Sequence, residues 1–159
     1  MNQRKSGVSN RRDAREFCLQ FLYHFQLPIF QDAKMSLSKE TETSVLFERI
    51  HEFKQTLDLK ISADQEAFVM SIVRGILKNI DPLEEIVTKY LKNWKLSRLS
   101  KIEHTLLIMA TYELLFSKEV PEKVVINEAL ELSKKYSSKE SSSFINGILD
   151  AILKNEEKK

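Results

Sequence analysis

The amino-acid sequence predicts an all-α protein, a helical bundle of about seven helices. Only 3 glycines and 3 prolines occur in 159 residues, too few for the frequent turns of a β-sandwich or the glycine-rich turns of a doubly wound sheet. Hydrophobic residues make up 42% of the chain, enough to bury a core. Apolar residues also recur at spacings of three and four, as in amphipathic helices. The length fits one domain, residues 1–159.

The first helix is predicted behind a basic N-terminus, residues 1–9, which we expect to be flexible. The helix is expected to end near Pro28, and residues 31–43 are polar and without a sustained period, which indicates a surface loop. A second helix is predicted over residues 45–57. The apolar stripe of the first helix consists of Ala14, Phe17, Cys18, Phe21, Leu22 and Phe25.

Capping signals predict where the later helices begin. Ser62 followed by Gln65 has the spacing of a capping box, in which each side chain accepts a hydrogen bond from the other residue's backbone N–H. Four further starts are predicted: at the Asp81-Pro82 pair, at Ser100 with Glu103, at Pro121, and at Ser137 with Glu140. The helix after Ser100 is apolar on most of its circumference, which is typical of the centre of a bundle. Residues 154–159 form a charged tail.

Composition favours a cytoplasmic protein. The net charge of +2 predicts neither nucleic-acid nor membrane binding by itself. The longest aliphatic run, residues 106–110, is far shorter than the roughly 18 residues of a membrane span, and no apolar signal-peptide core follows the basic N-terminus. The single cysteine, Cys18, has no partner for an intramolecular disulfide. We therefore expect no membrane association.

No set of residues predicts an enzyme. His24, His51 and His104 fall on three different predicted helices, which disfavours a metal site, and no glycine-rich loop is present to hold a nucleotide phosphate. Cys18 lies in an apolar stripe, where a free cysteine is usually a small buried hydrophobe. The sequence therefore predicts no catalytic residue, no metal and no cofactor.

A row of arginines on the first helix is the clearest functional signal. At about 100° per residue, the apolar stripe centres near 300° when Arg11 is set to zero. Arg15 then falls at about 40°, Arg12 at about 100° and Tyr23 at about 120°. Guanidinium groups match phosphate geometry and an exposed tyrosine can stack on a base, so this row favours single-stranded nucleic acid. The alternative is a solvated or membrane-surface basic face.

These residues resemble the NusB family of transcription antitermination factors. The arginine-rich start of the first helix, residues 11–23, looks like that of the family. The second half is more specific, because several short strings occur in the family's order and approximate spacing. They are Trp94, Leu99 to Glu103, Ala110 to Leu114, Val120-Pro121, Val124 to Ala129, and Phe144 to Asp150. The resemblance covers residues 10–28 and about 69–153.

The resemblance implies two packed helical subdomains and a non-enzymatic role. Proteins of the family bind the single-stranded boxA element of ribosomal RNA operons with NusE, a small-subunit ribosomal protein, and act with other Nus factors on the RNA polymerase elongation complex. By position, Arg11, Arg12 and Arg15 match RNA-binding arginines. Tyr23 and Phe144 are expected at the RNA surface, and Tyr23 and Glu103 at the NusE surface.

Several alternatives stay open at this point. Phe144 could belong to the core, and Glu103 could be no more than the third residue of a capping box. Gly147 in mid-helix indicates close helix packing. Asp13 between the arginines indicates a low RNA affinity for the protein alone. A homodimer is possible, and the rival function is a helical protein-protein adaptor without sequence-specific RNA binding.

Overall fold

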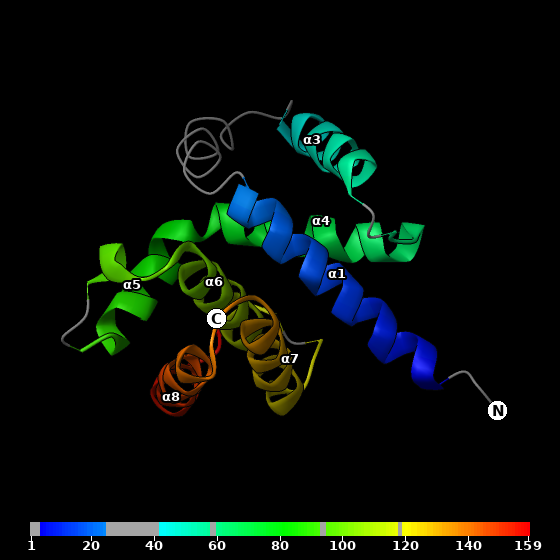
Figure 1. Cartoon of the computed structure of the whole chain (residues 1–159). Helices are drawn as coiled ribbons and strands as arrows, with labels where there is room; N and C mark the ends of the chain where they lie inside the picture. Colours follow the sequence, from blue (N-terminus) through cyan, green and yellow to red (C-terminus); the bar gives the residue numbers. More distant parts are fainter. Residues whose placement is uncertain (1–3, 25–41, 58–59, 93–94, 118) are drawn as a thin grey trace. The chain divides into compact units, whose positions relative to one another are not determined.

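The computed structural model describes residues 4–24, 42–57, 60–92, 95–117 and 119–159. Within these ranges the chain forms seven α-helices, one 3-10 helix and no strand, so the predicted all-α class is confirmed (Figure 1). In chain order, the elements are α1 (Arg4–His24), α3 (Glu42–Thr56), α4 (Ala63–Lys78), α5 (Ile80–Tyr90), η1 (Leu96–Arg98), α6 (Lys101–Leu115), α7 (Glu122–Tyr136) and α8 (Lys139–Asn155).

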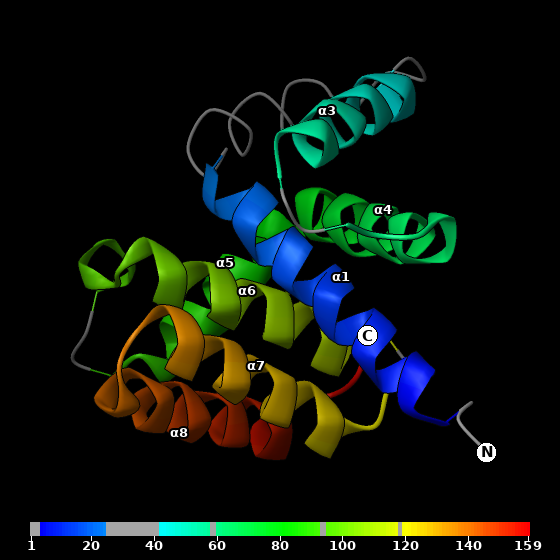
Figure 2. The same ribbon diagram turned by 45° about the vertical axis from the view of Figure 1, so that its right-hand side comes forward.

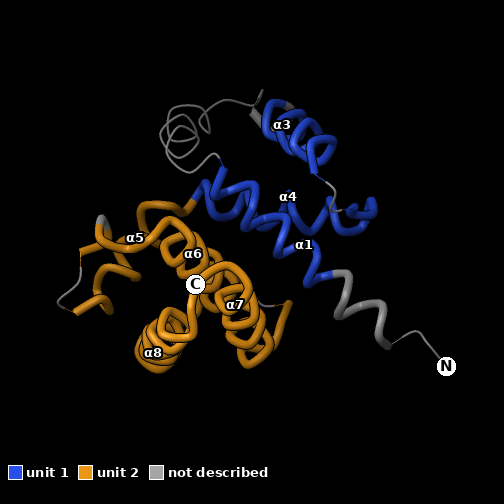
Figure 3. The backbone as a smooth tube through the Cα atoms, in the orientation of Figure 1, with its two compact units in different colours: residues 1–78 blue, residues 79–159 orange. Residues whose placement is uncertain are grey.

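The chain divides into two compact units, residues 1–78 and residues 79–159 (Figure 3). The first unit contains α1, α3 and α4, and the second contains α5 to α8. The boundary falls between α4 and α5, where Asn79 alone separates the two helices.

Aromatic side chains build the core of the first unit, in which α1 and α3 both contact α4 (Figure 2). Phe53 of α3 meets Phe17 and Phe21 of α1 edge-on, with 5.5 Å between ring centroids in each pair. This geometry brings the positive edge of one ring toward the negative face of another. Cys18 is fully buried in the same helix face, as its place in the apolar stripe predicts.

Helix α6 is the central helix of the second unit. It contacts α5, α7 and α8, and residues 105–111 and 113–115 are buried. A helix that is apolar on most of its circumference needs neighbours on several sides, and α6 has them. The prediction from the sequence is therefore confirmed.

Two predicted capping boxes are present. The Ser62 N–H donates to Gln65 Oε1 at 2.6 Å, and the Gln65 N–H donates to Ser62 Oγ at 3.3 Å, so α4 begins directly after Ser62. Ser100 and Glu103 make the corresponding pair of bonds at the start of α6. Each box satisfies backbone N–H groups that have no partner inside the helix.

Two other starts differ from the prediction. Helix α8 is capped by Ser138 rather than Ser137, because the Ser138 hydroxyl accepts from the Ser141 N–H. Helix α5 begins at Ile80 with Asn79 as its N-cap, so Asp81 does not cap it. Pro82 fits inside the first turn because the N–H that proline lacks would have no intrahelical partner there.

The N-terminal helix is longer than predicted. We expected residues 1–9 to be a flexible lead-in, but α1 begins at Arg4. The segment gives no apolar period, yet it contains no proline, and a helix can extend upstream from an apolar stripe without one. Residues 1–3 and 25–41 lie outside the described residues, and with them Phe25, the helix end expected near Pro28 and most of the predicted loop. The last two residues of that loop, 42–43, belong to α3.

The end of α8 is tied to α5 within the second unit. Glu156, which follows the helix, accepts hydrogen bonds from Lys89 Nζ and from Tyr90 Oη, both at 2.6 Å. The Lys159 N–H also donates to the carbonyl oxygen of Leu115 at 2.7 Å. The charged tail therefore contacts helices of its own unit. None of the helices in the described ranges is long and apolar enough to cross a membrane.

Gly147 does not have the close packing that the sequence led us to expect. It is exposed on α8, and a Cβ atom built there would meet no atom within 4 Å. Its φ is not positive, so the backbone does not require glycine either. Within this chain, the glycine only lowers the helix propensity of α8.

Gly147→Ala is therefore expected to raise the free energy of unfolding by about 0.5–1 kcal/mol, since alanine loses less backbone entropy on forming a helix. Urea unfolding of both proteins under the same conditions measures the change. A decrease in stability would show that the position is packed after all.

Candidate nucleic-acid interface

Helix α1 carries two exposed arginines beside its buried face. Arg11 and Arg12 are both exposed, whereas residues 14–19 are buried. Tyr23 lies near the C-terminal end of the same helix, and 45% of its surface is exposed. The first unit thus presents two guanidinium groups and one aromatic ring on a single helix.

Phe68 of α4 contacts Arg11 and a third arginine of α1, Arg15. The guanidinium carbon of Arg11 lies 5.5 Å from the Phe68 ring centroid, and that of Arg15 lies 5.4 Å from it. Residues four apart project from the same side of a helix, so one ring can meet both side chains. A cation over an aromatic face is attracted by the negative charge of the ring. The contact fixes where the Arg11 guanidinium sits.

The sequence did not identify Phe68. On a helical wheel it lies at the edge of the apolar stripe of α4, next to Val69, where it looks like an ordinary core residue. Its partner is on another helix, more than fifty residues earlier in the chain. A pattern within one helix carries no information about this pairing.

The prediction of a row of exposed arginines is wrong for Arg15, which is buried. Only 5% of Arg15 is exposed, although the helical wheel places it beside the apolar stripe. The wheel accounts for a single helix, whereas here α4 packs against that flank and Phe68 lies against the guanidinium. Arg11 and Arg12 are therefore the exposed members of the row, and Arg15 is its buried member.

This arrangement suits phosphate binding. A guanidinium group donates two parallel hydrogen bonds to phosphate oxygens, and stacking on a ring leaves its N–H edge available for them. An arginine already held in place loses less side-chain freedom when it binds. The exposed Tyr23 ring can stack on an unpaired base.

Glu103 has a structural role at the start of α6, in the second unit. The Ser100 N–H donates to Glu103 Oε2 at 2.9 Å, and the hydroxyl of Ser141 in α8 donates to Glu103 Oε1 at 2.8 Å. Partial burial raises the Glu103 pKa, but these hydrogen bonds lower it more, so it lies below the ordinary value of 4.5. Both carboxylate oxygens thus have partners, and Glu103 links the first turns of α6 and α8.

Phe144 is half-buried on α8 and lies outside the set of fully buried side chains. It therefore has surface available for a ligand, as its predicted role requires. In the ranges that the structure describes, no group of three or more His, Cys, Asp or Glu side chains is arranged to hold a metal ion.

Comparison with known proteins gives one consistent family. Residues 12–154 match the model of the NusB family. The transcription antitermination protein NusB of Thermodesulfovibrio yellowstonii is 37% identical over 146 residues, covering 92% of this chain and 93% of that protein. The protein of the same name from Clostridium kluyveri is 54% identical over 89 residues, or 56% of this chain.

Solved structures agree. T. maritima NusB has a TM-score of 0.72 and 31% identity, and the match covers 92% of each chain. A structure of antitermination factors NusB and NusE in complex with double-stranded RNA gives a TM-score of 0.73 at 24% identity, covering 93% of this chain and 98% of that one. The second likeness concerns the fold alone.

Arg15 and Arg12 provide a matched pair for a stability test. Arg15→Gln is expected to lower the free energy of unfolding by about 1–2 kcal/mol, because it removes the stack on Phe68 and the packing of a buried side chain. Arg12→Gln, at an exposed position, is expected to change it by less than about 0.5 kcal/mol. Denaturant unfolding measures both, and equal effects would contradict the difference in burial.

The lowered Glu103 pKa predicts a pH-dependent contribution to stability. An ionised carboxylate that is bound more tightly in the folded state stabilises it above the unfolded pKa, and this stabilisation is lost as pH falls through the folded pKa. The stability gap between the wild type and Glu103→Gln should therefore be largest at neutral pH and should close below pH 4.5, the ordinary value. A gap that is independent of pH would contradict the assignment.

Proposed function

The chain belongs to the NusB family, and we propose that it is a transcription antitermination factor that binds the single-stranded boxA element of ribosomal RNA operons together with NusE. Its wider partners are then the RNA polymerase elongation complex and the other Nus factors. The proposal requires a binding protein rather than an enzyme. It rests on the family and on the geometry of α1.

One observation carries the RNA part of the proposal: Arg11 is exposed and at the same time held on the Phe68 ring, with the exposed Arg12 beside it. Two exposed positive groups from adjacent residues, one of them held on a ring, suit the repeating phosphates of a nucleic-acid strand. Phosphate contacts set affinity and register but carry no sequence information. The exposed Tyr23 ring is proposed to stack on an unpaired base, which adds affinity whatever the base, whereas base selection requires hydrogen bonds to base edges.

The remaining predicted residues keep their roles as proposals. Arg15 is the exception: because it is buried against the same Phe68 ring, we propose that it acts on RNA indirectly, through the packing around Arg11. Phe144 is proposed at the RNA surface, while Glu103 and Tyr23 are proposed at the NusE surface. For Glu103, contact with a partner would come in addition to its capping bonds. A homodimer is an alternative use of the same surfaces.

The proposed NusE partnership is supported by membership of the NusB family and by the fold that this chain shares with the NusB–NusE–RNA structure described above. Because Asp13 lies between the arginines, we propose that NusE adds contacts that the chain alone does not provide. RNA binding should therefore be tighter with NusE present than without it.

Fluorescence anisotropy of a labelled boxA-type RNA dodecamer tests this function. The protein is titrated with and without its cognate NusE, and a scrambled dodecamer serves as the control. We expect preference for the boxA sequence and tighter binding with NusE. If NusE binds but neither RNA is preferred, the chain is a helical protein-protein adaptor and the proposal fails.

The two exposed arginines should account for part of the salt dependence. Each phosphate contact on a single strand contributes about 0.7 to the slope of log affinity against log salt concentration, so Arg11→Gln with Arg12→Gln should make the slope shallower by about 1.4. The matched control, Lys123→Gln with Lys134→Gln on α7, removes the same charge from exposed positions of the other unit. An equal loss of affinity in both variants would point to a general charge effect.

A further inference from the structure

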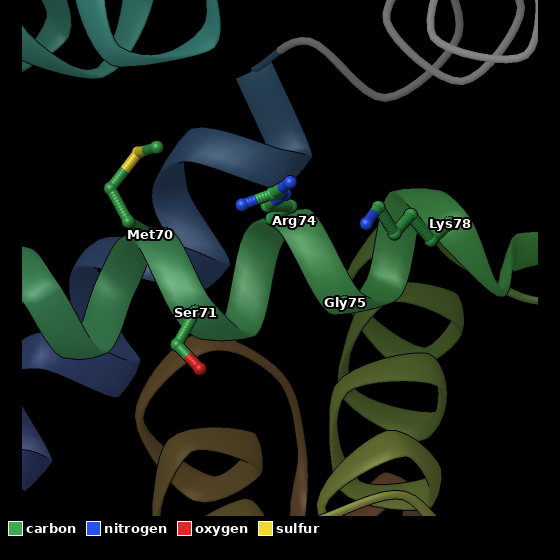
Figure 4. Close-up of a pocket in the computed structure, with 5 residues that line it drawn as sticks. All are labelled: Met70, Ser71, Arg74, Gly75 and Lys78. Atoms are coloured by element: carbon green, nitrogen blue, oxygen red, sulfur yellow. The ribbon is translucent and has the colours of Figure 1, made fainter. Parts of the chain in front are cut away.

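Helix α4 has a basic face whose two cations take no part in the site described above. Arg74 and Lys78 lie one helical turn apart, and both are exposed. Both lie along the upper side of the helix face in view in Figure 4, and the Ser71 side chain extends from the lower side of the same face. We call Ser71, Arg74 and Lys78 the α4 basic surface.

Within the described part of the chain, no ion pair involves Arg74 or Lys78. Lys54 on α3, by contrast, lies 3.4 Å from Glu66, at the opposite flank of α4. Two adjacent positive charges with no nearby acid raise the local concentration of an anion.

Five described residues line a shallow and largely open depression on this side of α4: Met70, Ser71, Arg74, Gly75 and Lys78. Gly75 has no side chain and Ser71 has a short one, so an extended ligand can approach the helix closely between the cations. The Ser71 hydroxyl is a further hydrogen-bond donor, and no acidic side chain is among these residues.

The α4 basic surface continues from the proposed arginine site. Phe68, Ser71, Gly75 and Lys78 follow one another at spacings of three and four along one flank of α4. At 1.5 Å per residue, Lys78 lies about 15 Å along the helix axis from Phe68. A strand bound at Arg11 over Phe68 can therefore run along this flank to Arg74 and Lys78.

We propose that the α4 basic surface is a second phosphate-binding site, which holds the backbone of single-stranded RNA next to the segment bound by α1. The proposal rests on the proposed RNA-binding function and extends its footprint. RNA is favoured over an acidic protein because protein interfaces are anchored by large apolar or aromatic side chains in their centre. Among the described residues that line this depression, Met70 is the only large apolar one.

The test compares the wild type with Arg74→Gln/Lys78→Gln, using the boxA-type and scrambled RNA dodecamers in the presence of NusE. Because backbone contacts carry no sequence information, the variant should lose the same factor in affinity, roughly tenfold at low salt, for both RNAs. The boxA preference should stay unchanged, and the salt slope should become shallower by about 1.4. Both residues are exposed, so the thermal unfolding midpoint should also stay unchanged.

The outcomes separate this proposal from the proposed function. If the wild type prefers boxA and the variant matches it in affinity and salt slope, the α4 proposal is overturned and the function stands. If the wild type shows no preference, the proposed function fails, whatever the variant does. If the variant loses NusE binding but keeps RNA binding, the surface contacts protein and the proposal is wrong. The Lys123→Gln/Lys134→Gln control should resemble the wild type throughout.

Discussion

The stack of two α1 arginines on the Phe68 ring is the interaction on which the proposed RNA site depends. It joins α1 to α4, buries Arg15 and fixes Arg11 at the surface. Without the ring, Arg11 would be a long flexible side chain that loses most of its rotamer freedom on binding. The contact lies where α1 packs against α4, so the proposed binding surface is built at a helix–helix contact of the first unit.

Residues of the same chemical type have different roles in this protein, and the burial of each side chain determines whether its role is in binding or in stability. Arg12 is exposed at the surface, whereas Arg15, three residues later, is buried against Phe68 of the neighbouring helix. Glu103 is similar: its two oxygens join the first turns of α6 and α8, so any contact with a partner is added to a structural role. Substitutions at such residues affect stability and binding together.

The local features of the fold could be predicted from the sequence, because apolar periodicity and capping depend on residues within one helix. The boxes at Ser62 and Ser100 and the central α6 are examples. Features that depend on contacts between two helices could not be predicted from the sequence. The helical wheel of α1 predicted an exposed Arg15 because a wheel takes no account of a neighbouring helix such as α4. Phe68 looked like an ordinary core residue of α4 for the same reason. The predicted cap, Ser137, was one residue too early, because the backbone path selects Ser138.

NMR chemical-shift mapping tests the central claim most directly. Backbone amide signals of the isotope-labelled protein are followed while boxA-type RNA is added in the presence of unlabelled NusE, and shifts caused by NusE alone are subtracted. The RNA-dependent changes should be largest around Arg11 and Arg12 and should include Phe68 and the following turns of α4. Changes confined to the second unit, with α1 unaffected, would contradict the account.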